Sequence, residues 1–489
     1  MDPSKSVFQD EAMEYEFSEP SNKKLIAHQD FSSFSRLGGR YWKNGFTSGS
    51  LFKFTLRKEP SVLSHVCYDN DRFERLMEKF LDEAFLTLIF LKNVKKLSFY
   101  VMEQRTSHLN EVFSINMNES SGGKEKEIFS SSIKKHVAEK NFERIEVLNH
   151  TLNLVQHYKN RQQTFTYVVS EYFGFSGNNP EFVSMMTDDD LSYVPLIAVA
   201  LPIECADVGG HIFAALPLPL QVKCMTGMPV HVNGFFALGQ DRKDLKWRTL
   251  TEGKSSNDKT VNWNFCLLTE LLPAVYANLI KYLIAQRKWK VSDVYKAWPC
   301  KTKVDRKWNV FLDQYYKLMF TEKCIYSNSS GKWMGINEVY FIDEKEFDCE
   351  DQITTIMGLM ASGGLYVERV SPNITESYTS ERLKWVNNAL VRLILKKDQS
   401  EYQRLSMTYK TKVLQFVVKQ LSDWDELSGM KLFPYVNGSY GSLNNSNMVL
   451  DQKIQMLLPS REYTLDQSIF NHAHALLLTF KNWVKKGNS

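Results

Sequence analysis

Residues 227–238 have the sequence GMPVHVNGFFAL, and a charged run, QDRK, follows at 240–243. The segment begins with glycine and proline and continues with β-branched and aromatic side chains, as strands do. The strand is expected over 230–238, and the charges that follow it mark its exit into a loop. The pattern predicts a buried strand followed by an exposed basic loop, which the aromatic Trp247 closes.

Working outward, more strands and one long helix complete a block around this segment. The stretches 164–170, 196–201 and 211–216 are apolar or alternating and are punctuated by glycine or proline, which predicts strands. Leucines and other apolar residues then recur at helical spacing over 267–283. Pro273 falls inside that pattern and predicts a kink or a helix start there. We interpret residues 161–295 as a strand-rich α/β domain closed by a long helix.

The flanking regions give the rest of the expected organisation. Residues 50–57 predict a strand, a capping box at Asp71 and Glu74 opens an amphipathic helix that runs to Ile89, and 95–102 predicts another strand. Residues 105–160 lack clear periodicity and are expected to be a polar excursion and linker. Residues 296–489 mix helices with short turns, including a hairpin turn at Asn437-Gly438. The fold class is therefore α+β, with boundaries at 1–104, 105–160, 161–295 and 296–489.

Composition excludes several classes of protein. Of 489 residues, 43% are hydrophobic and 24% charged, which is ordinary for a globular chain. A net charge of +4, spread evenly, does not favour a nucleic-acid partner. The longest apolar run, 194–203, is about half of a membrane span, and the N-terminus shows no secretory signal. Seven scattered cysteines fit a reducing, cytoplasmic location.

Catalytic and metal-binding patterns are weak. Cys205, His211, Cys224 and His231 lie close in sequence, but their spacing matches no paired-ligand arrangement. Buried side chains are the favoured interpretation, and a metal-dependent enzyme using these four residues is the alternative. A phosphate loop would need a glycine where Arg248 stands. We therefore expect no cofactor and no catalytic residues.

Several stretches resemble the sacsin family. Residues 210–220 and 227–247 resemble part of the sacsin repeat, and the spacing onward to 263–264 and 271–276 is similar. Residues 49–57 look like the strand that closes the family's ATPase-like domain, and 427–435 give a weaker match. The resemblance extends over about positions 45–440.

This resemblance implies the end of a heat-shock/gyrase-type ATPase-like domain, followed by the α/β block. The family's magnesium helix, adenine turn and glycine-rich lid should precede Gly49, and the sequence shows none of them there. Gly49 and Ser50 would be a remnant near a nucleotide, and we expect no nucleotide binding by this polypeptide. Both ends look cut, as in a fragment, a partial gene model or a degenerate paralogue.

The resemblance also implies candidate interaction residues. In related ATPases a basic side chain of the following domain reaches the γ-phosphate, and Arg242 and Lys243 occupy a plausible position for it. A solvated basic loop is the alternative. The full set of candidate residues on the strand and loop is His231, Asn233, Gly234, Phe235, Arg242, Lys243 and Trp247.

The leading hypothesis is a non-enzymatic, chaperone-like module. It would bind client proteins and heat-shock chaperones on its strand and helix surfaces, and neither nucleic acid nor membrane. A structural spacer between neighbouring repeats is a further alternative. The sequence leaves self-association open.

Overall fold

The helices and strands fall into two compact units. The computed structural model describes residues 42–43, 46–47, 56, 58–62, 64–102, 109–118, 123–203, 209–219, 225–248, 256–369, 372–375, 378, 383–421, 423–434 and 440–442. One unit comprises Met1–Ser120 and Leu152–Thr166, and the other comprises Ser121–Thr151 and Tyr167–Ser489. We call them the N-terminal unit and the C-terminal unit.

Helix α2 (Asn70–Thr87) is the main helix of the N-terminal unit, and it confirms the helix that apolar spacing predicted. Its N-cap is Asp69, whose Oδ1 accepts a hydrogen bond from the backbone N–H of Arg72 at 2.8 Å. The predicted capping box at Asp71 is therefore wrong, because an acceptor two residues earlier already satisfies the free N–H groups. A short antiparallel pair, β1 (Trp42–Lys43) and β2 (Phe46–Thr47), precedes the helix.

Most of the long strands belong to one sheet with the order β3-β4-β5-β6-β7-β10-β8-β9. The β8–β10 pair is parallel, whereas the β3–β4, β4–β5, β6–β7, β7–β10 and β8–β9 pairs are antiparallel. The strands are β3 (Lys96–Met102), β4 (Leu109–Asn118), β5 (Glu146–Tyr158), β6 (Arg161–Phe173), β7 (Leu196–Pro202), β8 (Ile212–Ala214), β9 (Leu216–Pro217) and β10 (His231–Gly234).

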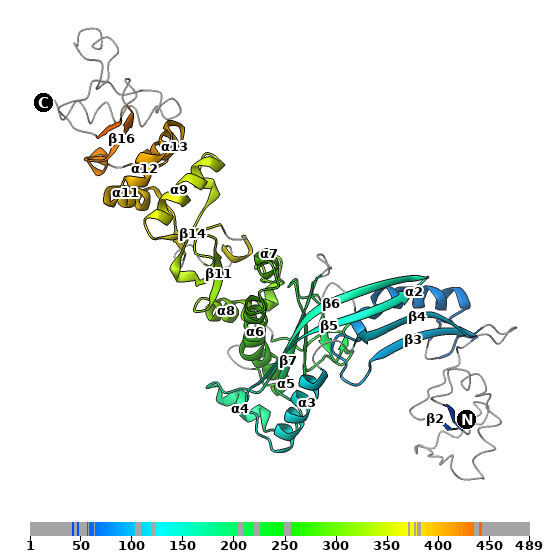
Figure 1. The fold of residues 1–489 in the computed structure, drawn as a ribbon. Coiled ribbons are helices and arrows are strands. Elements are labelled where there is room, and N and C mark those ends of the chain that lie inside the picture. Colours follow the sequence, from blue (N-terminus) through cyan, green and yellow to red (C-terminus); the bar gives the residue numbers. More distant parts are fainter. Residues whose placement is uncertain are drawn as a thin grey trace, which may run out of the picture. The chain divides into compact units, whose positions relative to one another are not determined.

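The sheet residues of the N-terminal unit have a buried face beneath α2. Phe113, Ile115 and Leu154 are almost completely buried, and Leu154 alternates with more exposed neighbours, as the two-residue period of a strand requires. Phe85 of α2 stacks on Phe165 of β6 with ring centroids 4.4 Å apart. Figure 1 shows α2 lying along these strands. The helix therefore covers one face of the sheet, and the polar side chains lie on the other face.

A continuous helical stretch forms the centre of the C-terminal unit's core. It consists of α5 (Lys259–Cys266), a π-helical turn (Leu267–Leu271) and α6 (Leu272–Ala285). Pro273 lies in the first turn of α6, directly after the π turn, so the predicted irregularity is confirmed and the wider turn accommodates the missing N–H. By length and composition this stretch could cross a membrane, but 61% of its most apolar window is buried inside the protein. It packs as a core helix.

The sheet of the C-terminal unit packs against this stretch. Val199, Ala200 and Val232 on its strands are fully buried, and so are Leu271 and Val275 on the helix. Two more helices, α3 (Gly123–Ala138) and α4 (Pro180–Met186), contribute Phe129, Phe182 and Met185 to the same core.

The remaining elements of the C-terminal unit alternate helices with short strands. They are α7 (Val291–Lys296), α8 (Asn309–Met319), β11 (Lys323–Ser327), β12 (Lys332–Gly335), β13 (Val339–Phe341), α9 (Glu350–Ser362), β14 (Tyr366–Glu368), α10 (Pro372–Thr375), β15 (Lys384–Trp385), α11 (Asn388–Lys397), α12 (Ser400–Arg404), α13 (Met407–Val418), β16 (Lys431–Pro434) and β17 (Tyr440–Ser442), with 3₁₀ turns at Arg306–Trp308, Ile336–Glu338, Glu344–Glu346 and Trp424–Leu427.

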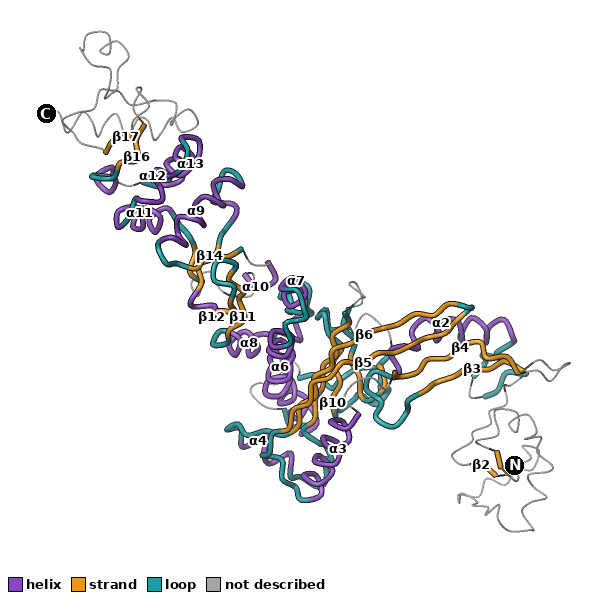
Figure 2. The backbone as a smooth tube through the Cα atoms, in the orientation of Figure 1, coloured by secondary structure: helices purple, strands orange, loops and turns teal. Residues whose placement is uncertain are grey.

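A second hydrophobic cluster occupies the last part of this unit. Ile356 of α9, Val391 of α11 and Phe416 of α13 meet there, and Figure 2 shows these helices gathered beside β14 and β16. Strands β16 and β17 pair antiparallel on either side of residues 435–439, as the predicted hairpin requires. The Asn437-Gly438 turn itself lies outside the described residues.

The expected α+β class is confirmed. The ATPase-like identity of the first domain stays a prediction, because the strand expected at 50–57 lies almost entirely outside the described residues. Residues 105–160 differ from the expected polar excursion, since β4, α3 and most of β5 lie there. These strands have one more exposed side, where asparagine and histidine weaken the sequence signal.

Candidate functional site: a basic turn behind a buried strand, and a pocket at a hairpin tip

Strand β10 is the buried strand that the sequence predicted, although it is shorter than the apolar run. It lies between β7 and β8, with His231 opposite Ala200 and Val232 opposite Ile212. The apolar residues after Gly234 leave the sheet and cross over to α5. Although β10 has only four residues, it is held in the sheet because it pairs with a strand on each side.

His231 and its neighbour His211 are structural side chains. Their rings stack with centroids 5.5 Å apart, and His231 Nδ1 accepts the backbone N–H of His211 at 3.2 Å. Burial, and then the nearby His211, lower the pKa of His231 to about 3, and burial also lowers the pKa of His211. Both rings are therefore neutral near pH 7, as expected for imidazoles in an apolar interior.

The proposed four-residue metal cluster is only partly visible. The structure brings His211 and His231 together, whereas Cys205 and Cys224 lie outside the described residues. Within the described part of the chain, no group of three histidine, cysteine or acidic side chains is placed to hold a metal ion.

Asn233, Gly234 and Phe235 shape the end of the strand. The Asn233 side chain accepts the backbone N–H of Ala215 at 2.9 Å and so joins β10 to the turn after β8. A Cβ at Gly234 would come within 3.0 Å of the Phe236 ring. Phe235 leaves 44% of its surface exposed, while its carbonyl accepts from Trp263 Nε1 at 2.8 Å. The ring of Phe235 is therefore exposed, while its backbone is held in place by a hydrogen bond.

Helix α5 holds the loop that follows. Asn264 is 2% exposed, its Oδ1 accepts the N–H of Ala237, and its Nδ2 donates to the carbonyls of Ala237 and Lys246. The three bonds measure 2.8–2.9 Å. Both ends of the basic loop are thus fixed by one buried amide, a function that sequence spacing did not reveal.

The basic loop is a tight turn whose tip carries the two candidate cations. Leu238 and Leu245 form a β-bridge at its base, and the N–H of Arg242 donates to the carbonyl of Gly239 at 2.9 Å. Arg242 has a left-handed φ of 53°, an uncommon conformation for a residue with a side chain. Arg242 and Lys243 are both exposed, which agrees with the sequence prediction. The base of the turn is thus held by backbone hydrogen bonds, and the guanidinium of Arg242 is exposed at its tip.

Trp247 packs inside the unit. Its ring meets Trp308 edge to face with centroids 5.3 Å apart, and the ammonium of Lys307 lies 4.6 Å from its centroid. Its Nε1 donates to Asp244 Oδ1 at 3.0 Å. Of the candidate residues, Trp247 thus anchors the loop by packing, whereas Arg242 and Lys243 form its exposed part.

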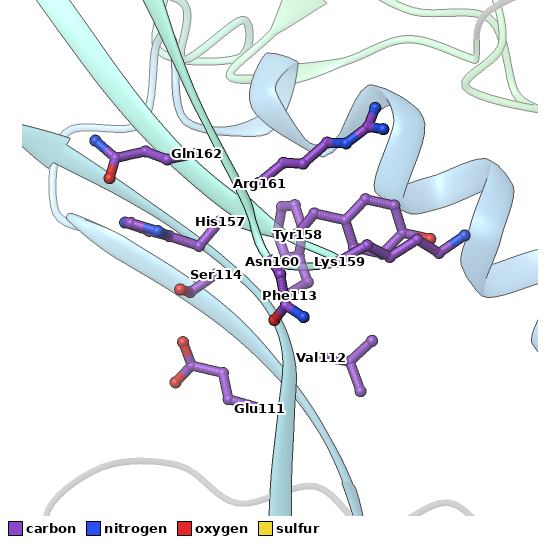
Figure 3. Close-up of a pocket in the computed structure, with 10 residues that line it drawn as sticks. All are labelled: Glu111, Val112, Phe113, Ser114, His157, Tyr158, Lys159, Asn160, Arg161 and Gln162. Carbon is purple, nitrogen blue, oxygen red and sulfur yellow. The ribbon is translucent and has the colours of Figure 1, made fainter.

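The structure shows a pocket that the sequence analysis missed. It lies in the N-terminal unit, has a volume of about 590 Å³ and is shown in Figure 3. Residues 111–114 of β4 and 157–162 of the β5–β6 hairpin line it. Glu111, Ser114, His157 and Gln162 project to one side of the strands, and Val112, Lys159 and Arg161 to the other. No local motif marks these residues, although the strict alternation of 146–158 could have predicted the strand.

With the fold and these sites described, the comparisons with known proteins can be stated. A family model for the sacsin domain matches residues 1–114. Residues 1–114 are therefore similar to a sacsin domain. Over 454 residues, 86% of the chain, it is also 29% identical to sacsin from Homo sapiens, a distant homologue. The matched stretch is 10% of that protein, so the chain spans about a tenth of its length. No solved structure matches the chain.

The resemblance to sacsin is therefore confirmed, and the homology extends well beyond the domain match. The matched domain includes Gly49 and Ser50, the two residues interpreted as a nucleotide-proximal remnant. Both lie outside the described residues, so their role stays a prediction.

Proposed function

We propose that this sacsin-domain chain is a non-catalytic module that binds client or partner proteins in cytoplasmic protein quality control. The observation that carries the proposal is the exposure of large apolar side chains on well-formed elements of both units. The similarity to sacsin supports it, because the resemblance implies a chaperone-like role. Partners would be unfolded clients and heat-shock chaperones, and neither nucleic acid nor membrane.

Helix α2 gives the larger of these surfaces. Leu76 and Met77 each lie three or four residues from Phe73 and from Phe80, so the four residues share one side of the helix. Leu76 is 47% exposed and Phe80 39% exposed, and Leu81 is the first buried residue of the helix. The first half of α2 thus presents an apolar stripe, the kind of surface that accepts apolar segments of another chain.

A smaller surface lies at the end of strands in the C-terminal unit. Leu216 on β9 is 51% exposed, and Phe235 follows β10. Asn233 pairs with Phe213, and Leu216 with Ala214, so both exposed side chains stand at the same end of neighbouring strands. Their backbones are held by the sheet and by α5. Binding there would cost little ordering entropy.

The titratable side chains of the core support a non-catalytic role. Burial raises the pKa of Cys266 and of Cys324 to about 12, so these thiols are protonated and unreactive near pH 7. Burial lowers the pKa of His150, as of His231, to about 3. A general base or an activated thiol needs the opposite shifts.

Suppression of client aggregation tests the proposal. The chain is expected to slow the aggregation of heat-denatured citrate synthase, measured by light scattering. The double variant Leu76→Glu/Phe80→Glu, which places charges in the α2 stripe, is expected to lose at least half of this effect. Lys79→Glu changes an exposed polar position of the same helix and should leave it unchanged. If the wild-type chain has no effect, a structural spacer is the better interpretation.

The loop at Arg242 favours a second role, toward the γ-phosphate of a neighbouring ATPase domain. Its support is the rigid base beneath an exposed guanidinium that has no side-chain partner among the described residues. A positioned cation stabilises the charge that develops in phosphoryl transfer. The role needs an intact ATPase lobe and adds no activity to this chain alone.

Fusion to such a lobe provides the test. In a protein that joins this chain to a related ATPase lobe, Arg242→Ala is expected to lower ATP turnover about tenfold or more. Arg287→Ala is a matched control, because Arg287 is also exposed and left-handed, with φ 50°. Equal turnover of the Arg242→Ala and Arg287→Ala fusions would show that the loop is only solvated.

A further inference from the structure

Strand β4 extends beyond the hairpin that pairs with it. On one side it pairs with β3 as far as Leu109, which lies opposite Met102. On the other side its pairing with β5 stops at Phe113, opposite Tyr158. Residues 109–112 therefore have a partner strand on one edge and, among the described residues, none on the other. We call these four residues the β4 overhang.

A bulge lies within the overhang. Phe99 pairs with Phe113 and Tyr100 with Glu111, so Val112 is the extra residue. A bulge bends its strand and interrupts pairing locally, so the regular part of the overhang is the three residues beyond it, 109–111. Alternate backbone groups of the overhang face the side where β5 has already turned away, as at any sheet edge. The overhang is about 13 Å long, at roughly 3.3 Å per residue.

The hairpin tip closes one end of this edge. Strand β5 ends at Tyr158 and β6 begins at Arg161, so the turn has two residues, Lys159 and Asn160, with φ of 47° and 60°. Left-handed residues at both positions define a type I′ turn, which holds the two strands at their natural twist. The pocket of Figure 3 lies where this tip meets residues 111–114.

The lining of the pocket carries two exposed cationic side chains, Lys159 and Arg161, and one exposed carboxylate, Glu111. Arg161 is exposed and has no acidic partner among the described residues. Glu111, the pocket's acidic residue, is already engaged, because the hydroxyl of Tyr100 donates to its Oε2 at 2.5 Å and the ammonium of Lys96 lies 3.9 Å from it. Hydrogen bonds from Ser114 and Tyr100 lower the pKa of Glu111, which keeps it ionised and satisfied. A ligand would therefore meet the guanidinium of Arg161.

We propose that the β4 overhang binds an extended acidic peptide segment of a partner protein. The segment would add a short antiparallel strand in line with β5 and place a carboxylate against Arg161. Backbone hydrogen bonds along the overhang provide the affinity, and the charged contact at the hairpin tip sets the position and favours acidic sequences. The site is separate from the apolar surfaces proposed for clients, so it does not depend on the chaperone proposal.

A labelled peptide and the full chain test this proposal. The probe is an acetylated six-residue peptide, two aspartates followed by alternating valine and threonine, with a fluorophore at its C-terminal end. Its fluorescence anisotropy should rise to saturation as the chain is added. Arg161→Glu is expected to weaken binding about tenfold or more, since it reverses the charge that meets the carboxylates. Arg306→Glu makes the same charge change at an exposed position of the C-terminal unit, and it should leave peptide binding unchanged.

Two modified peptides separate strand addition from simple charge attraction. The same probe with alternate backbone amides N-methylated keeps its charge and loses its ability to pair, and it should not bind. A probe with two lysines in place of the aspartates should bind at least tenfold more weakly. The proposal is overturned if the acidic probe shows no binding at millimolar chain concentration, if N-methylation or charge reversal of the probe has no effect, or if Arg161→Glu binds as the wild type does.

Discussion

Replacing Asn264 by leucine is expected to lower the free energy of unfolding by about 3–5 kcal/mol, the largest effect of any single change considered for this chain. The side chain makes three hydrogen bonds to the backbone at Ala237 and Lys246, and it is 2% exposed. Leucine fills a similar volume but leaves the N–H of Ala237 and the carbonyl of Lys246 without this partner, while the carbonyl of Ala237 keeps its bond from the N–H of Lys246. Each such group costs about 1–3 kcal/mol.

Urea unfolding followed by tryptophan fluorescence measures this loss. Asn141→Leu is the matched control, since Asn141 is exposed and its side chain has no comparable bonds among the described residues, and it should change stability by about 0.5 kcal/mol or less. A loss below about 1 kcal/mol for Asn264→Leu would mean that water replaces the amide and that the basic loop is less rigid than the structure indicates.

Lowering the pH from 7 to 5 is expected to destabilise the C-terminal unit by about 2 kcal/mol for each of two buried histidines, His150 and His231. The ordinary histidine pKa is 6.5, and burial lowers that of both folded groups to about 3. Between these values the unfolded chain binds more protons than the folded chain. Stability is therefore greatest above about pH 6.5 and falls as the pH drops toward 3.

The surroundings of each ring explain the two shifts. His150 is 5% exposed, and the cationic Lys126 adds to the penalty of burial. His231 has 0% exposure and is surrounded by His211, Tyr167 and Phe213, whose rings lie 5.5–5.9 Å away. Protonation would place a charge in either buried site, and at His150 that charge would also be repelled by the ammonium of Lys126.

Variants at single histidines separate this effect from general acid unfolding. His150→Leu removes one titrating group, so its stability should fall less steeply below pH 6.5, by about 1.4 kcal/mol per pH unit. His65→Leu changes an exposed histidine and should leave the slope as in the wild type. Identical acid slopes for His150→Leu and the wild type would exclude His150 as a source of the pH dependence.

Sequence alone predicted elements whose apolar residues recur at a regular spacing or in an unbroken run. Helix α2 and strand β7 have strong apolar patterns, and the structure confirms both of them. Strands β4 and β5 were missed, because one face of each is more exposed and carries asparagine or histidine. In such strands only the period of two remains as a signal, and residues that favour turns obscure it.

The candidate site was predictable to a similar extent. The exposed turn at Arg242 and the buried strand at His231 follow from composition, and both are found. The anchoring by Asn264 was not predictable, since it joins positions 27 residues apart through one side chain. Trp247 illustrates the same limit, because its packing partner Trp308 is distant in sequence.

The core helix over 259–285 has a consequence for biosynthesis. Tyr276 packs on Phe311 and Tyr315 of α8, with centroids 5.6 and 5.0 Å away. A ribosome that adds about 5–20 residues per second needs roughly 2–7 s to make the stretch from residue 286 to the end of α8. For those seconds a segment apolar enough to enter a lipid bilayer leaves the ribosome without its cover. The nascent chain is itself a substrate for the cell's folding machinery at that stage of translation.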